Sequence, residues 1–296
     1  MKKTFIFAAM AAVAAFCFTA CGSDDDDYVA PKSDVVLPIP ENAKNAASFE
    51  EIKNVVTEGK KLEGITFTEA GNAIVEVAGE FVAARYQFAD DLYTLTGAVT
   101  GTIKDKSTKA AGGTTLSINI TVTINGKTYT FSSTDAAANR VTAAEIASNT
   151  NLNNICRNWN FNGMKLALYG DVSMTKSYQT GYLKQLGTDA NDNGADLSDD
   201  ELDELDKTVQ GIEFTMTGKL YLKYIEDGKD KTICAEWNSS NFTEFIIEDI
   251  SEANKFIDKD SKINVNFDAN GTCSATFYTK IKGGKNYEAY LTVYLK

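Results

Sequence analysis

A run of acidic and amide side chains in the second half of the chain could bind calcium. Asp189, Asn191 and Asn193 occupy alternate positions, and Glu201 follows as a further carboxylate. Calcium prefers six to eight hard oxygen ligands, which alternate loop positions can supply. The spacing therefore predicts a calcium site, although the last carboxylate comes one residue later than in an EF-hand. The alternative is a solvated acidic turn that leads to a helix capped by Ser198, since acidic residues favour a helix start.

Tyrosines in two expected strands could bind a ligand. Tyr290 and Tyr294 share one face of the last expected strand, residues 286–295, and Tyr221 shares a face with two lysines in residues 211–225. Tyrosines on a solvated sheet face could stack on sugar rings. They could equally pack beneath a helix, because aromatic residues are common in strands.

The chain contains no histidine. This composition excludes the Ser-His-Asp and Cys-His catalytic systems and the zinc sites that use histidine ligands. Catalysis by two carboxylates remains open, because the chain has 41 acidic residues. The sequence thus favours a non-catalytic protein with no cofactor other than calcium.

The first residues predict the location of the protein. A basic start, an apolar run over residues 5–18 and small residues before Cys21 are typical of a secretory signal peptide. The run is too short to cross the ~30 Å hydrocarbon core of a membrane. Cys21 lies where a bacterial lipoprotein is cleaved and acylated, so we expect residues 1–21 to be the signal peptide including the lipidated Cys21.

An acidic stretch, Gly-Ser-Asp-Asp-Asp-Asp, follows Cys21 at residues 22–27. This beginning resembles surface-exposed lipoproteins of the Bacteroidetes, in which such a stretch is associated with export to the outer leaflet. The resemblance implies a lipid anchor in the outer membrane and display on the cell surface. Residues 22–40 would then be an acidic tether.

The charge of the chain limits its partners. Without Lys2 and Lys3 of the signal peptide, 27 basic residues stand against 41 acidic ones, which gives a net charge of −14. Such a chain repels nucleic acid and anionic headgroups. Attachment to the membrane must come from the acyl chains.

The periodicity of the chain predicts a mainly β (α+β) fold. Residues 116–124 alternate apolar and polar side chains, and Asn125-Gly126 is a strong hairpin signal. Capping signals predict helices from Ser48 to about Lys61, from Thr142 toward Cys156, and from Ser198 to about Val209. We expect antiparallel meanders that form barrel- or sandwich-like halves with a few capping helices.

Two segments are similar to each other. Residues 64–71 and 211–218 share Gly, Ile, Phe, Thr and Gly at equivalent positions. A strand followed by a turn could produce this match by chance, but the expected order of helix and meander in both copies favours a duplication. It predicts two related β-rich halves, residues 41–150 with an N-terminal helix and residues 151–296.

Three cysteines remain after cleavage: Cys156, Cys234 and Cys273. An odd count allows at most one disulfide, so the fold does not depend on a disulfide scaffold. Cys156 and Cys234 follow apolar neighbours, and we expect them to act as small buried hydrophobic residues.

The stretch Asn-Ile-Cys-Arg-Asn-Trp at residues 154–159, with Ala-Asp-Leu at 195–197 and Gly-Ile-Glu-Phe-Thr at 211–215, resembles a pattern of Bacteroidetes lipoproteins of unassigned function. The resemblance covers mainly residues 153–225. It implies lipocalin-like or similar antiparallel β architecture and brings no catalytic residues.

Together these observations predict a non-catalytic cell-envelope lipoprotein, anchored through Cys21, that binds an extracellular glycan or protein. The alternatives are a carboxylate-dependent glycan hydrolase and a structural envelope component.

Overall fold

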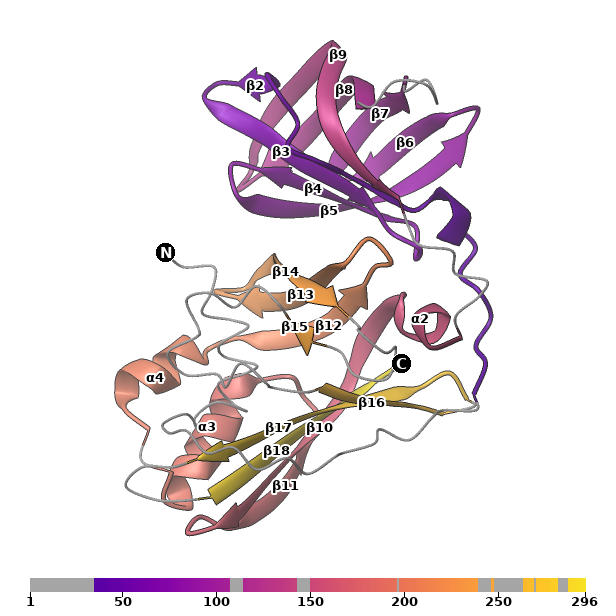
Figure 1. Ribbon diagram of the computed structural model, residues 1–296. Coiled ribbons are helices and arrows are strands. Elements are labelled where there is room, and N and C mark those ends of the chain that lie inside the picture. Colours follow the sequence, from indigo (N-terminus) through magenta and orange to yellow (C-terminus); the bar gives the residue numbers. More distant parts are fainter. Residues whose placement is uncertain are drawn as a thin grey trace. The chain divides into compact units, whose positions relative to one another are not determined.

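The protein folds mainly as antiparallel β-structure, which confirms the expected fold class (Figure 1). The computed structural model describes residues 35–106, 114–142, 150–195, 197–238, 246–247, 263–268, 270–281 and 287–296. The chain forms two compact units. The barrel unit comprises Pro38–Arg157 and Phe214–Thr217, and the sheet unit comprises Asn158–Glu213, Gly218–Lys296 and residues 35–37.

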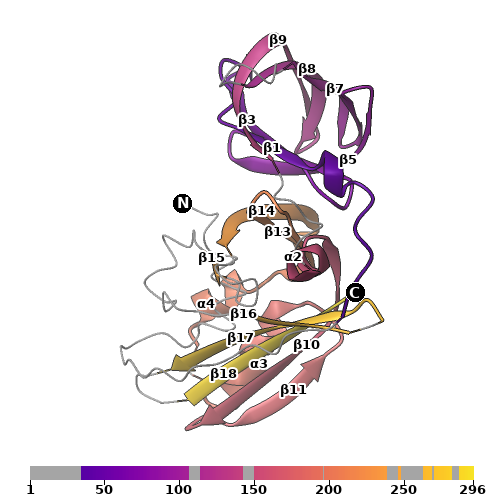
Figure 2. The ribbon, with the colours of Figure 1, turned by 45° about the vertical axis from the view of Figure 1, so that its right-hand side comes forward.

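The barrel unit is a closed eight-stranded β-barrel built as an up-and-down meander. Its strands are β1 (Ala47–Glu50), β3 (Lys60–Phe67), β4 (Asn72–Val77), β5 (Glu80–Ala89), β6 (Leu92–Gly97), β7 (Val99–Asp105), β8 (Thr114–Ile124) and β9 (Lys127–Thr142). Figure 2 shows the barrel strands arranged in a ring. A short strand β2 (Val56–Thr57) pairs with β3, and a 3₁₀ turn, η1 (Ala43–Asn45), precedes β1.

Strand β1 closes the barrel. Its residue Phe49 lies opposite Arg140 of β9 and opposite Ile65 of β3. Four residues therefore pair with both end strands of the meander, which closes the sheet into a barrel.

The prediction of a helix from Ser48 to about Lys61 is wrong, because this stretch contains strands β1 and β2 and the start of β3. Ser48 belongs to β1, where its hydroxyl lies 2.8 Å from that of Thr66 on β3. The capping signal depends only on the local sequence, whereas the β1 backbone forms hydrogen-bond ladders with two other strands, β3 and β9. Pairing with β9 and β3 outweighs the local helix preference.

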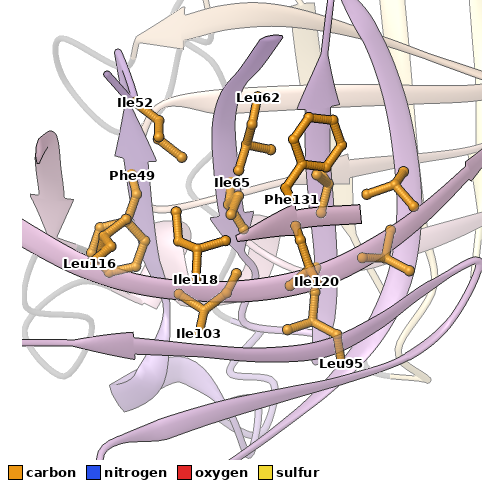
Figure 3. Close-up of a cluster of buried hydrophobic side chains, with 14 of the residues drawn as sticks. Phe49, Ile52, Leu62, Ile65, Leu95, Ile103, Leu116, Ile118, Ile120 and Phe131 are labelled. Carbon is orange, nitrogen blue, oxygen red and sulfur yellow. The ribbon is translucent and has the colours of Figure 1, made fainter. Parts of the chain in front are cut away.

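The barrel interior is filled by apolar side chains. Inward residues alternate along each strand and form one hydrophobic cluster (Figure 3). Aromatic rings pack at one part of it, where the Phe67 and Tyr93 rings stack at 3.7 Å and Tyr86 meets Phe67 edge-on. An eight-stranded barrel is just wide enough for its side chains to fill.

The sheet unit contains a second nine-stranded antiparallel sheet in the order β15-β14-β13-β12-β10-β18-β17-β16, with β11 also paired to β10. Its strands are β10 (Asn158–Gly170), β11 (Met174–Tyr178), β12 (Thr208–Phe214), β13 (Lys219–Glu226), β14 (Lys229–Asn238), β15 (Ile246–Ile247), β16 (Ile263–Phe267), β17 (Cys273–Ile281) and β18 (Tyr287–Leu295). The long strand β10 pairs with β12 at its start, with β11 farther on, and with β18 along its other edge.

The helices in the described ranges are short: α2 (Thr150–Ile155), α3 (Leu183–Asp192) and α4 (Asp199–Glu204). The expected helix toward Cys156 corresponds to α2, although residues 143–149 lie outside the described ranges. The helix expected from Ser198 to Val209 ends at Glu204, because β12 begins at Thr208. Helix α3 was not expected. Within the described part of the chain, no helix is long and apolar enough to span a membrane.

The two similar segments adopt the same local structure. Residues 64–67 and 211–214 end strands β3 and β12, and a four-residue turn follows in each. Both turns end on glycine in the left-handed region, Gly71 at φ 78° and Gly218 at φ 81°. The order of elements around the copies differs, because α4 precedes β12 whereas strands precede β3.

Candidate ligand-binding surface

One face of the sheet unit carries exposed tyrosines on neighbouring strands. The burial pattern of β18 alternates, with its odd-numbered residues from Tyr287 to Leu295 buried. Tyr290 and Tyr294 consequently point to the opposite face. The register pairs Glu288 of β18 with Tyr169 of β10, so that Tyr169 lies on this face too. We call Tyr169, Tyr290 and Tyr294 the tyrosine face.

The rings of the tyrosine face are accessible and ordered by contacts. Tyr169 is 52% exposed and Tyr294 is 40% exposed, while Tyr290 is half-buried. The rings of Tyr169 and Tyr290 meet edge-on with centroids 5.8 Å apart, and the Tyr290 hydroxyl donates to Oε2 of Glu288 at 3.0 Å. Ala167 lies opposite Tyr290 and is buried. The face therefore presents aromatic surface to solvent, and contacts hold the rings of Tyr169 and Tyr290 in place.

Hydroxyl and ammonium groups surround the rings. Thr292 lies between the two tyrosines of β18, and its hydroxyl is 3.0 Å from the hydroxyl of Thr276 on β17. Lys165 of β10 lies opposite Thr292 and is half-buried. Aromatic surface for stacking and polar groups for hydrogen bonds thus occur on the same face.

Glycine makes room beside Tyr294. Strand β10 has an irregularity between Phe161 and Met164, and Gly163 there has φ 120°. A Cβ at Gly163 would lie 3.2 Å from the Tyr178 carbonyl oxygen and 3.9 Å from Cδ2 of Tyr294. The left-handed conformation and the close backbone both favour glycine.

Helix α3 packs on the other face of this sheet. Lys176 of β11 lies opposite the buried Leu166, and its Nζ is 2.6 Å from Oδ2 of Asp189 on α3. Leu183 and Leu186 of α3 are buried. The helix therefore packs on the apolar face, while Tyr169 and Tyr294 are exposed on the opposite face.

Tyr221 does not belong to the tyrosine face. It is only 2% exposed, and its neighbours Leu220 and Leu222 are buried as well. Strand β13 is thus covered on both faces at this point, and of the two alternatives for Tyr221 its burial supports packing. The lysine neighbours of Tyr221 favoured a solvated face. The burial of a central strand depends on side chains from other segments, which its own sequence does not show.

The residues expected to bind calcium lie around the end of α3. Oδ1 of Asp189 accepts from Nε2 of Gln185 at 3.1 Å, and its Oδ2 pairs with Lys176. The Asn191 side chain bonds to the backbone of Leu197, and Nδ2 of Asn193 donates to the Asp189 carbonyl oxygen.

These bonds assign the Asp189 and Asn191 oxygens to protein donors. In the described residues, no group of three or more His, Cys, Asp or Glu side chains could hold a metal ion. The side chain of Glu201 lies outside the described part, and calcium binding stays a prediction.

Cys156, Cys234 and Cys273 form no disulfide with one another in the structure. Cys156 is buried as expected, and burial raises the pKa of its thiol well above the usual value. Cys273 is buried as well, while Cys234 is half-buried. These thiols are packing residues. Cys21 lies outside the described residues.

Sequence reasoning missed Tyr169. The signal was the alternation of β10, where Met164, Leu166 and Leu168 are buried and Tyr169 follows on the opposite parity. Only the register with β18 shows that Tyr169 lies beside Tyr290.

A comparison of the chain with protein-family models found no match, and neither did a comparison with curated proteins.

Proposed function

We propose that this protein is a cell-envelope lipoprotein, anchored through Cys21 and displayed on the outer surface, that binds a neutral extracellular glycan through the tyrosine face. The observation that carries the proposal is the exposed pair Tyr169 and Tyr294, with Tyr290 in contact with the Tyr169 ring and hydrogen-bonded to Glu288. Tyrosine rings offer flat apolar surface with a polar edge, which suits sugar rings.

The geometry of the face favours an extended ligand. Tyr290 and Tyr294 are four residues apart on one strand, a spacing of about 13 Å. A single sugar cannot reach both rings, whereas a short oligosaccharide can. The net charge of −14 for the mature chain supports a neutral glycan over an acidic one.

The test is affinity electrophoresis of the purified protein in gels that contain neutral or acidic polysaccharides. We expect retardation by at least one neutral polysaccharide. The double variant Tyr290→Ala/Tyr294→Ala should bind roughly tenfold more weakly or worse, because each aromatic contact contributes about 0.5–1.5 kcal/mol.

Tyr182→Ala is the matched control, because Tyr182 is half-buried and its hydroxyl bonds to Asp206 away from the tyrosine face. Unchanged binding by the double variant, or retention by acidic polysaccharides alone, would contradict the proposal. Release of reducing ends from the polysaccharide would favour the glycan hydrolase instead.

A further inference from the structure

Three reactive side chains from three neighbouring strands meet in the sheet unit. Nζ of Lys223 on β13 lies 2.6 Å from Oε2 of Glu213 on β12 and 2.6 Å from Oδ1 of Asn158 on β10. The Glu213 side chain is fully buried, and that of Lys223 is 24% exposed. An amine is thus held against a carboxamide, next to a buried carboxylate.

The amide of Asn158 is oriented for attack by Lys223. Its Nδ2 donates to Oδ1 of Asn160 at 3.2 Å, so that its oxygen faces the lysine and its nitrogen faces away. A carbonyl bond is about 1.2 Å long, so Cγ of Asn158 lies at most about 3.8 Å from Nζ of Lys223. Productive contacts between reacting atoms are roughly 3–3.5 Å, so only a small movement is required.

The backbone fixes this arrangement. Asn158 and Glu213 are directly opposite in the β10–β12 ladder, and Gly211 lies opposite Asn160. A Cβ at Gly211 would lie 2.3 Å from the Trp159 carbonyl oxygen. The absence of a side chain at Gly211 allows β12 to approach β10 closely, which places Glu213 beside the two reacting groups.

We propose that Lys223 and Asn158 form an intramolecular isopeptide bond, with Glu213 as the group that transfers protons. The Glu213 carboxylate accepts a proton from the Lys223 ammonium, and the neutral Nζ then attacks Cγ of Asn158. Glu213 returns the proton to the developing oxyanion, and the new bond joins Nζ to Cγ.

The step balances without an oxidant or a cofactor. When the carbonyl re-forms, the bond from Cγ to Nδ2 breaks and the amide nitrogen leaves with the protons that Nζ has lost. An ammonium side chain and a carboxamide become a secondary amide and an ammonium ion. Glu213 ends the reaction in the protonation state in which it began.

This bond would brace the sheet unit covalently. It would join β10 to β13 across the intervening β12 and link residues 65 positions apart. Cys156, Cys234 and Cys273 form no disulfide with one another that could do the same. A cross-link limits the unfolded chain much as a disulfide does.

The experiment is peptide mapping of the full-length protein, extracted in detergent and digested with trypsin. Cleavage after Arg157, Lys165, Lys219 and Lys229 should give one branched peptide that contains residues 158–165 and 220–229. Its mass should be lower than the sum of the two linear peptides by one ammonia, and trypsin should not cleave after Lys223. Linear peptides at their sequence masses, with cleavage after Lys223, would overturn the proposal.

Variants separate the roles of the three residues. Lys223→Arg keeps the charge but removes the nucleophile, and Glu213→Gln removes the proton acceptor, so both should lose the branched peptide completely. Lys219→Arg, on the same strand, should retain it. A branched peptide of unchanged yield in Glu213→Gln would overturn the role of Glu213. The wild-type map decides on the bond itself even if a variant fails to fold.

Discussion

Asp189 couples helix α3 to strand β11 through a charge held in a largely buried site. Burial acts to raise the pKa of its carboxyl, but the Lys176 ammonium, the Tyr178 hydroxyl and the Gln185 amide together outweigh it, and the pKa lies below its usual value. A carboxyl whose pKa is lower in the folded state stabilises the fold above its unfolded pKa of about 3.9. That contribution disappears as the pH falls through the folded value.

We therefore predict that Asp189→Asn lowers the melting temperature at pH 7, and that this effect shrinks as the pH falls below about 3.9 and the folded wild-type carboxyl becomes protonated. The amide cannot form the ion pair with Lys176, which lies 2.6 Å from Oδ2. Thermal unfolding of both proteins across this pH range checks the prediction. Asp203→Asn is the control, because Asp203 pairs with Lys184 through a side chain that is largely exposed. A constant difference between wild type and Asp189→Asn at every pH would contradict it.

At the scale of elements, close contact between β10 and β12 depends on Gly211. We predict that Gly211→Ala lowers the melting temperature and also reduces the yield of the branched peptide that joins Asn158 to Lys223. A methyl group at this position would lie 2.3 Å from a backbone oxygen, which forces the strands apart. Glu213 would then move away from Asn158.

The control for Gly211→Ala is Gly126→Ala, because a Cβ at Gly126 meets no atom within 4 Å and affects only the β8–β9 turn, where φ is 78°. Both variants are compared by thermal unfolding and by the tryptic map. Equal yields of branched peptide in Gly211→Ala and wild type would show that the reacting groups do not depend on this strand contact.

The elements that could be predicted are those whose signals are local. Asn125-Gly126 marks the β8–β9 hairpin, as expected, and Asp227-Gly228 marks the β13–β14 hairpin in the same way; the residues of both turns adopt positive φ. Alternation correctly gave the outward faces of Tyr290 and Tyr294. The helix predicted at Ser48 is wrong because β1 pairs with the distant strand β9. The sequence left open whether Tyr221 is exposed or packed, because the burial of β13 on both faces depends on other segments of the chain.

At the scale of the molecule, the two units arrange their antiparallel strands differently. The barrel unit closes on itself through β1, and its interior is packed with aromatic and aliphatic side chains. In the described residues of the sheet unit, the end strands β15 and β16 do not pair with each other, helix α3 lies on one face, and Tyr169 and Tyr294 are exposed on the other. The barrel thus encloses its apolar side chains within a closed sheet, whereas the second sheet provides accessible aromatic surface.

The proposed anchor makes a prediction about the whole chain. A mature chain with a net charge of −14 gains nothing from anionic headgroups, so acyl chains on Cys21 must supply its membrane affinity, at about 0.8 kcal/mol for each buried CH₂. We expect the wild-type protein to remain with membranes in high salt and Cys21→Ala to be released. Cys17→Ala is the control, because Cys17 lies within the apolar run of the signal peptide.

Protease treatment of intact cells should degrade the wild-type protein, since a tether would hold it outside the outer leaflet. Retention of Cys21→Ala in membranes would contradict the anchor, whereas a lipidated but protected protein would place the tyrosine face in the periplasm, where its ligand would be an envelope glycan.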